Sequence, residues 1–235
     1  MSNKENIDHR HGNAANNPDF RETMNWRIFR IMAEVIEGFQ GIADFKTSVS
    51  IFGSSRSTPD DHYYKEAQKL GNMLAEKGIT VVTGGGPGIM EAGNRGALEG
   101  GGDSVGLKIE LPKSVDQETP NKYANTTINF HYFFTRKLML TYAAEAYVYF
   151  PGGFGTLDEF FEIVTLIKTD KICSHILVVL VGVEYWQPLI NWFKSELHDE
   201  HAYIDDKALN IFKLVDTAEE ALELILKEVK PRKEI

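Results

Sequence analysis

Residues 146–167 have the sequence AYVYFPGGFGTLDEFFEIVTLI, and this stretch indicates the architecture of the whole chain. Its first five residues form a continuous apolar run, which is typical of a strand covered on both faces. A glycine-rich turn follows, after which Phe160, Val164 and Ile167 recur at helical spacing. The sequence therefore predicts a buried parallel strand that leads through a tight loop into a helix.

The same alternation continues in both directions along the chain. The run ILVVLV at 176–181 is another candidate for a strand without an exposed face. The expected strands are 48–52, 79–82, 104–109, 126–130, 146–150, 175–181 and 211–215. The expected helices begin near Asp60, Pro87, Phe133, Thr156, Tyr185 and Thr217. The predicted fold is α/β, a Rossmann-like doubly wound parallel sheet with helices on both faces.

The chain has 235 residues, enough for one full-sized domain. Residues 1–20 are polar and Asn-rich, so we expect a disordered tail before a single nucleotide-binding domain at 21–235. His9 and His11 in this tail are weak metal candidates, and a solvated tail is the plainer interpretation. From Trp26 to Phe39 apolar residues recur at helical spacing, which predicts an N-terminal helix packed on the domain or on a partner subunit.

Composition narrows the function classes. Lys and Arg total 25 against 34 Asp and Glu, a net charge of −9, which argues against nucleic-acid or membrane partners. Cys173 is the single cysteine, so it forms no intrachain disulfide, and its apolar neighbours indicate a buried thiol in a reducing compartment. No apolar run approaches the roughly 18 residues of a membrane helix and no apolar signal segment is seen, so we expect a cytoplasmic protein.

Loops after strands are the places to look for a ligand site, because ligands of open parallel sheets bind beyond the carboxyl ends of the strands. Three such loops have the sequences GSSR (53–56), TGGGPGIME (83–91) and PGGFGTLDE (151–159). The last two, expected at neighbouring strand ends, place glycines where backbone N–H groups could cradle an anion, although glycines also serve tight turns alone. Neither matches the GxxxxGKS, GxxxxGKT or GxGxxG patterns, and we find no GxSxG motif or metal-ligand cluster.

Two charged elements could supply chemistry. Glu159 shares a face of the first helical turn with Thr156, so we expect it to point into the crevice, ionised by the helix N-terminus. Ordinary helix-start chemistry is the alternative. Arg136 or Lys137 of FFTRK (133–137) could reach the same crevice, but adjacent residues differ by about 100° around a helix, so at most one can face a given ligand atom. A surface salt bridge is the other interpretation.

The segments TGGGPGIMEAGNRGA (83–97), FFTRK and PGGFGTLDE together resemble the LOG (LONELY GUY) family, cytokinin riboside 5′-monophosphate phosphoribohydrolases long mislabelled lysine decarboxylases, and especially its longer bacterial branch. The resemblance covers about residues 48–215. It implies hydrolysis of the N-glycosidic bond of a purine nucleoside 5′-monophosphate, AMP or N6-modified AMP, to free base and ribose 5-phosphate. It further implies an AMP nucleosidase type of enzyme without a cofactor, assembled as a homodimer or larger homo-oligomer.

The resemblance places the catalytic pair on Arg136 and Glu159. The loops and the resemblance together give these substrate-binding candidates: Gly53, Ser54, Gly85, Gly86, Gly88, Glu91, Lys137, Gly152, Gly153, Gly155, Thr156 and Thr165. A further family glutamate falls on Glu110 or Glu118. The residues before Arg136 are Phe-Thr, where many members carry glutamate or glutamine, so the preferred base is left open.

The chemistry agrees with these roles. Breaking the C1′–N bond builds positive charge on the sugar, which a fixed carboxylate such as Glu159 stabilises in the transition state. Arg136 would position the substrate. The alternative is a non-catalytic nucleotide or molybdopterin-cofactor carrier of the same fold, which would keep the glycine loops. Nothing in the sequence suggests a lysine arranged to hold pyridoxal phosphate, so decarboxylation of lysine is disfavoured.

Overall fold

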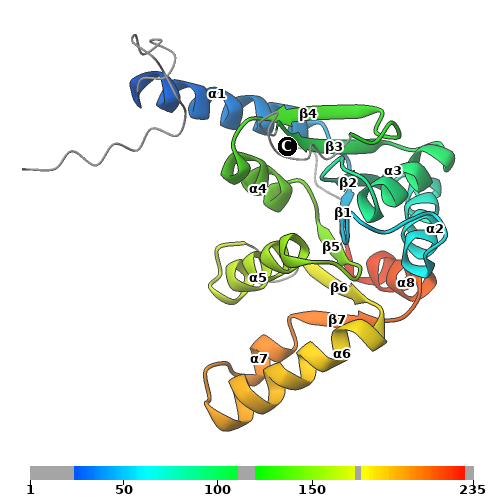
Figure 1. Cartoon of the computed structure of the whole chain (residues 1–235), viewed down its shortest axis with the longest axis vertical. Coiled ribbons are helices and arrows are strands. Elements are labelled where there is room, and N and C mark those ends of the chain that lie inside the picture. Colours follow the sequence, from blue (N-terminus) through cyan, green and yellow to red (C-terminus); the bar gives the residue numbers. More distant parts are fainter. Residues whose placement is uncertain (1–23, 111–119, 173–175, 231–235) are drawn as a thin grey trace, which may run out of the picture.

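The computed structural model describes residues 24–110, 120–172 and 176–230. A seven-stranded sheet runs through its centre in the order β4-β3-β2-β1-β5-β6-β7, and all six pairings are parallel (Figure 1). The strands are β1 Ser48–Phe52, β2 Thr80–Thr83, β3 Ser104–Ile109, β4 Thr126–Phe130, β5 Ala146–Tyr149, β6 Leu177–Val181 and β7 Phe212–Val215. The predicted doubly wound α/β fold is confirmed.

Helices cover both faces of the sheet. They are α1 Met24–Ala43, α2 His62–Glu76, α3 Ile89–Glu99, α4 Phe133–Tyr142, α5 Phe154–Lys168, α6 Val183–Trp192, the π-helical η2 Phe193–Glu200, α7 Asp206–Leu209 and α8 Ala218–Glu228. In Figure 1, α2, α3 and α8 lie on one face, while α1, α4, α5 and α6 lie on the other. Each face has its own apolar core, with Tyr64 and Leu70 buried on the first and Phe160 and Trp186 on the second.

Element boundaries differ from the sequence prediction in a few places. The first helix runs past Phe39 to Ala43, because Ile42 still buries its side chain in the core. The helix expected near Tyr185 continues into η2, and the short α7 follows; neither was predicted. The helix expected near Thr217 is confirmed, with Thr217 as the N-cap of α8 in a capping box with Glu220. The expected tail at 1–20 and Cys173 lie outside the described residues.

The chain order of the strands reverses at β1, which pairs with β2 on one side and β5 on the other. This reversal creates the crevice in which doubly wound sheets bind ligands. The loops after the two strands are tied together there, since the Ser54 N–H donates to the Pro151 carbonyl oxygen at 2.9 Å. The expectation that the loops after β2 and β5 sit at neighbouring strand ends is wrong, because β1 lies between those strands.

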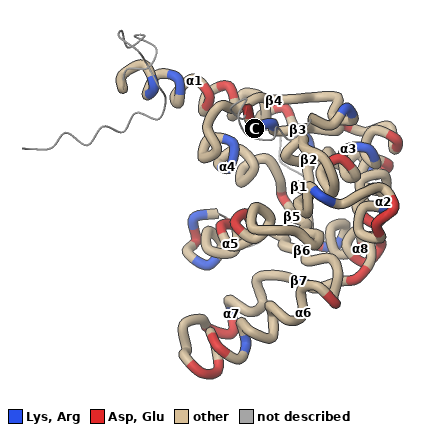
Figure 2. The backbone as a smooth tube through the Cα atoms, in the orientation of Figure 1, with Lys and Arg blue, Asp and Glu red and all other residues tan. Residues whose placement is uncertain are grey.

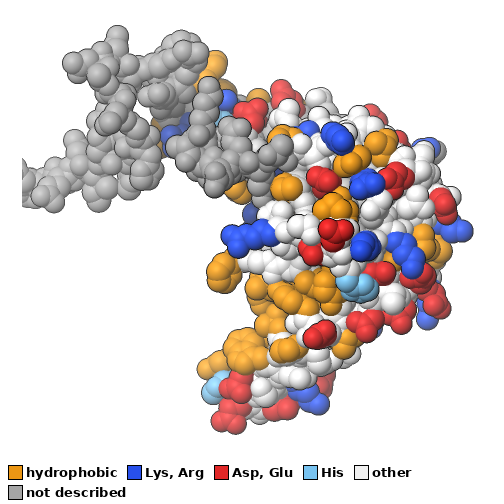
Figure 3. Space-filling model, turned by 45° about the vertical axis from the view of Figure 1, so that its right-hand side comes forward, with side chains coloured by type: hydrophobic (Ala, Val, Ile, Leu, Met, Phe, Trp, Pro, Cys, Tyr) orange, Lys and Arg blue, Asp and Glu red, His pale blue; other side chains and the backbone are white. Residues whose placement is uncertain are grey.

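Charge and hydrophobicity vary over the surface. Figure 2 shows basic positions interspersed with acidic ones along the described chain. On the face drawn in Figure 3, hydrophobic side chains gather towards the end formed by α6 and α7, below a region of mixed charge. Within the described ranges, no helix has the length and apolar character needed to cross a bilayer.

Candidate active site

A cavity of about 650 Å³ opens at the carboxyl ends of β1 and β5. It is lined by Phe52, by the loop after β1, residues 53–56, and by the start of α5. Helix α4 contributes Phe133, Arg136 and Lys137, while Met90 and Ile109 complete the lining. The cavity therefore lies where the reversal of strand order places a ligand site.

Arg136 is buried, although it carries a permanent charge. Its Nε donates to the Leu107 carbonyl oxygen at 2.7 Å, and its Nη2 donates to the Gly84 carbonyl oxygen at 3.1 Å. A Cβ on Gly84 would lie 2.0 Å from Nη2, so only glycine leaves room for the guanidinium. The side chain from α4 is thus fixed against β3 and the loop after β2, with its charge facing the cavity.

Glu159 lines the same cavity from the second turn of α5, and its side chain is half-buried. Burial raises its pKa to about 7. The positive charges of Arg136 and Lys137 lower this pKa, and the negative charges of Asp158 and Glu162 raise it further. The expectation that the helix N-terminus keeps this carboxyl firmly ionised is wrong, because loss of solvent outweighs the helix dipole and the nearby cations. A carboxyl with such a pKa can take up or release a proton near neutral pH.

Lys137 lies next to Arg136 in sequence but points to different partners. Its Nζ contacts Asp158 Oδ2 at 2.8 Å and Glu162 Oε2 at 3.0 Å, both on α5. Burial alone would lower the pKa of Lys137, but these two carboxylates raise it above its usual value. Both side chains line the cavity, Arg136 held by main-chain carbonyl oxygens and Lys137 bridged to α5.

The N-terminus of α5 opens into the cavity. Gly153 is its N-cap and provides no side chain to cap the first N–H groups of the helix. A Cβ on Gly153 or Gly155 would meet nothing within 4 Å, so these backbone segments border open space. A Cβ on Gly152 would instead lie 2.1 Å from the Thr156 hydroxyl, which explains the glycine there. Uncapped N–H groups and the helix dipole together suit an anion.

The structure brings eight of the predicted site residues to the cavity: Gly53, Ser54, Arg136, Lys137, Gly153, Gly155, Thr156 and Glu159. Six others lie outside its lining: Gly85, Gly86, Gly88, Glu91, Gly152 and Thr165. Thr165 is exposed farther along α5. The substrate contacts proposed for these residues remain predictions.

The glycine loop after β2 supports the site from behind. Gly88 has a φ of +69°, and a Cβ there would lie 2.2 Å from the Ser54 carbonyl oxygen, so this loop packs against the loop after β1. Asn121 closes the loop from the other side with hydrogen bonds to the carbonyl oxygens of Gly85 and Gly86. Glu91 accepts a hydrogen bond from the Tyr64 hydroxyl at 3.0 Å. These contacts fix the loop's conformation.

The resemblance placed substrate contacts along residues 153–159, and this segment includes the lining residues Phe154 and Asp158. The candidates left out these other lining residues: Phe52, Ser55, Arg56, Met90, Ile109 and Phe133. Most belong to the segments GSSR, TGGGPGIME and FFTRK, so their neighbours were the available signal. Phe154 lines the cavity and is 92% exposed. Glu110 is exposed, with its carboxylate 3.9 Å from His131 Nδ1, and Glu118 lies outside the described residues, so the further family glutamate stays unassigned.

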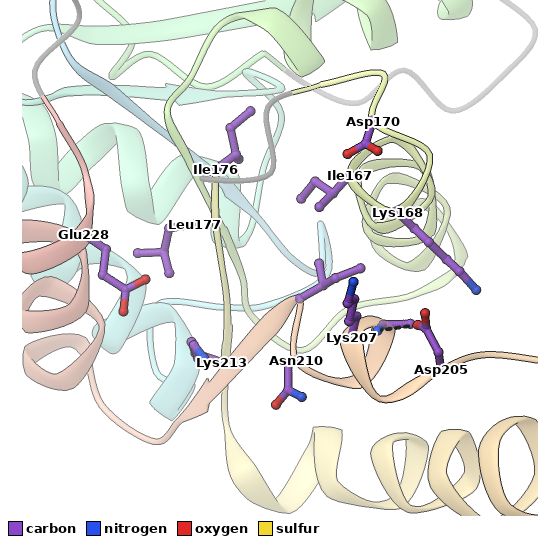
Figure 4. Close-up of a pocket in the computed structure, with 12 residues that line it drawn as sticks. Ile167, Lys168, Asp170, Ile176, Leu177, Asp205, Lys207, Asn210, Lys213 and Glu228 are labelled. Carbon is purple, nitrogen blue, oxygen red and sulfur yellow. Dashed lines mark hydrogen bonds between the residues drawn. The ribbon is translucent and has the colours of Figure 1, made fainter.

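A second cavity, of about 570 Å³, lies near the amino ends of β6 and β7. In Figure 4 its charged side chains point in different directions, and Lys168 is directed away from the centre. Asp205 is already engaged, because its side chain caps α7 through the Ala208 N–H. Over the described ranges, no group of three His, Cys, Asp or Glu side chains is placed to hold a metal ion. The cavity at β1 and β5 is the better candidate for chemistry.

Comparison with known proteins identifies relatives of the chain. A family model described as "Possible lysine decarboxylase" matches residues 90–225. A probable cytokinin riboside 5′-monophosphate phosphoribohydrolase, LOG4 of Oryza sativa subsp. japonica, is 30% identical over 179 residues, which is 74% of each chain. The cytokinin riboside 5′-monophosphate phosphoribohydrolase of Rhodococcoides fascians is 28% identical, over 67% of this chain and 76% of that protein.

Solved structures add evidence on the fold alone. The molybdenum cofactor carrier protein of Chlamydomonas reinhardtii superposes with a TM-score of 0.56 at 17% identity, covering 77% of this chain and 96% of that one. A molybdenum cofactor binding protein of Rippkaea orientalis gives 0.52 at 20% identity, with 77% and 94% covered.

Proposed function

The chain belongs to the LOG phosphoribohydrolase family, and we propose that it hydrolyses the N-glycosidic bond of a purine nucleoside 5′-monophosphate, AMP or N6-modified AMP. The products are the free base and ribose 5-phosphate. One observation carries the proposal: Glu159, with its pKa raised to about 7, shares a cavity with the uncapped N-terminus of α5. The carboxyl suits the reacting sugar, and the helix N-terminus suits the 5′-phosphate.

The reaction needs a nucleophile, a proton acceptor and a stabiliser of positive charge. The oxygen of a water molecule attacks C1′ while the C1′–N bond breaks, and the base leaves with the bonding electrons and takes up a proton. The Glu159 carboxylate accepts a proton from the attacking water and later releases it to the departing base, directly or through solvent, so the carboxylate is regenerated. In its ionised form it also stabilises the positive charge that develops on the sugar ring.

Arg136 contributes a fixed positive charge beside this carboxyl. Its guanidinium lowers the pKa of Glu159, so it favours the ionised form that the reaction uses. Held by two carbonyl oxygens, it needs no rearrangement when substrate binds. We assign it to positioning the substrate and offsetting negative charge on the phosphate or the departing base.

The description of the family model as lysine decarboxylases does not suit this cavity. Decarboxylation through pyridoxal phosphate requires a lysine amine that can lose its proton to form a Schiff base. The cavity lysine, Lys137, is paired with Asp158 and Glu162, which raise its pKa and hold it as an ammonium.

The test is an assay of substrate scope. Purified protein is incubated with AMP, GMP, IMP, CMP, N6-isopentenyl AMP and adenosine, with and without a chelator, and both ribose 5-phosphate and free base are quantified. We expect a purine monophosphate to be cleaved in chelator, with adenosine much poorer. Equal turnover of adenosine and AMP would contradict the role of the α5 N-terminus.

Variants separate an enzyme from a carrier. Glu159→Gln and Arg136→Ala should each lower the rate about a hundredfold or more, since a positioned charge is lost from the transition state. Glu184→Gln is the matched control, because Glu184 is an exposed carboxylate in the first turn of another post-strand helix, α6. Near-normal turnover by Glu159→Gln would favour the alternative, a non-catalytic nucleotide or molybdopterin-cofactor carrier.

A further inference from the structure

Helix α4 carries Arg136 and Lys137 into the cavity, yet its own N-terminus lacks local capping. Tyr132, the N-cap residue, makes no side-chain capping hydrogen bond, and the first turn contains no acidic residue. The exposed N–H groups at a helix start require an acceptor, and an anionic one is favoured by the helix dipole. A carboxylate from elsewhere in the chain lies at this helix start.

Glu34 of α1 supplies it. Its Oε1 accepts from the His131 N–H at 3.1 Å, and its Oε2 accepts from the Tyr132 N–H at 3.3 Å and from the Thr135 hydroxyl at 2.8 Å. The Thr135 hydroxyl also lies 2.7 Å from the Tyr132 carbonyl oxygen, so its single proton is shared between two acceptors. The carboxylate joins these three groups at the start of α4 from a position about a hundred residues earlier in the sequence. Hydrogen bonds to an ionised acceptor are stronger than neutral ones.

The rest of α1 lies along α4 and fixes its direction. A Cβ on Gly38 would come within 2.6 Å of Met139, so the glycine permits the two helices to approach closely. Farther on, the rings of Phe39 and Tyr142 lie 5.7 Å apart between centroids. Figure 1 shows α1 beside α4 at the β4 edge of the sheet. Glu34 anchors the end of α4 that is nearest the cavity.

We propose that Glu34 is a positioning residue for the cavity: it caps α4 from outside the α/β core and thereby fixes Phe133, Arg136 and Lys137. Phe133 is the first residue of α4, and Arg136 follows one turn later, directly after Thr135. Without Glu34, the N–H groups of His131 and Tyr132 that lead into this turn, and the Thr135 hydroxyl within it, lose their ionised acceptor. The turn that carries these cavity residues can then fray. The kinetic consequence of this inference rests on the proposed function. The structural role of Glu34 as a cap is independent of that function.

The kinetic test compares three variants at a temperature well below the melting point of each. Glu34→Ala should lower kcat about tenfold with a smaller change in KM, since loss of a helix cap is of that order. Glu34→Gln, which keeps one oxygen acceptor, should fall between alanine and wild type. Glu37→Ala is the control: Glu37 is exposed on the same helix, with no hydrogen bond recorded within the described residues, and should match wild type. A lower melting temperature for Glu34→Ala with unchanged kcat and KM would overturn the positioning role.

A second readout is independent of turnover. Hydrogen exchange of the backbone amides at 131–136 should accelerate in Glu34→Ala and stay unchanged in Glu37→Ala. If the wild-type protein cleaves no nucleoside monophosphate, the proposed function fails. The role of Glu34 is then tested by this hydrogen exchange and by calorimetric binding of ribose 5-phosphate. Unaltered exchange and binding in Glu34→Ala would refute the inference by themselves.

Discussion

Glu159→Gln should stabilise the folded protein while it inactivates the proposed enzyme, and the stabilisation should grow with pH. The Glu159 carboxyl has its pKa raised from 4.5 to about 7, chiefly by burial. Between these values the folded protein binds more protons than the unfolded chain, so the free energy of unfolding falls as pH rises. Glutamine has a similar shape and does not titrate, so it removes this loss.

The size of the effect follows from the raised pKa. If Glu159 were fully buried, Glu159→Gln would raise the free energy of unfolding by about 3 kcal/mol at pH values above 7. Water in the open cavity reduces this gain to about 1–3 kcal/mol. For a chain of this length, that corresponds to a rise in Tm of roughly 3–10 °C. At pH 4 the carboxyl is protonated in both states, so the two proteins should differ little there by this mechanism.

The assay is thermal unfolding of wild type, Glu159→Gln and Glu184→Gln at pH 5, 6, 7 and 8, at one protein concentration because any assembly adds to stability. The difference in Tm between Glu159→Gln and wild type should increase across this series, while Glu184→Gln shows no such trend. A difference that stays constant from pH 5 to pH 8 would refute the raised pKa and, with it, the acid-base role of Glu159.

Three further predictions concern catalysis and assembly. The wild-type kcat/KM for AMP should rise with pH to a plateau above about 7, as the Glu159 carboxylate forms; a rate that falls over that range would contradict a catalytic carboxylate. Gly84→Ala should lower activity about as much as Arg136→Ala, since its Cβ occupies the guanidinium position, and near-normal activity would mean that Arg136 can act from elsewhere. Because α1 exposes Phe29 (63%) and Met32 (52%), we expect at least a homodimer, unaffected by deletion of residues 1–20; light scattering that gives a 26.5 kDa particle would contradict it.

Local sequence patterns predicted the strands, most plainly β6, whose apolar run is buried along its whole length, whereas β4 is a mostly exposed edge strand. The runs at 48–52, 104–109 and 126–130 match β1, β3 and β4 residue for residue. The order of the strands across the sheet depends on which faces pack together, which no local pattern contains. This is why the loop after β2 was expected next to the loop after β5, although β1 separates them.

In the candidate site, too, local features could be predicted from the sequence and long-range contacts could not. The segments that line the cavity could be named in advance, because glycine loops and charged helix starts after strands are local features. The partners of those residues could not. Arg136 and Lys137 differ by one position, yet one binds main-chain carbonyl oxygens of distant strands and loops while the other pairs with carboxylates of α5. Glu34 gave no sequence signal, since its partners on α4 lie far along the chain.

Glu159 is where a local rule fails most clearly, and the failure has a physical source. A carboxylate in the second turn of a helix is stabilised by the dipole by less than about 1 kcal/mol, whereas removal from water costs several times more. The fold accepts this cost only with Arg136 and Lys137 close by, and Arg136 in turn requires the Gly84 and Leu107 carbonyl oxygens and a capped α4. Such a chain of supports around a destabilised carboxyl is expected where burial serves chemistry rather than stability.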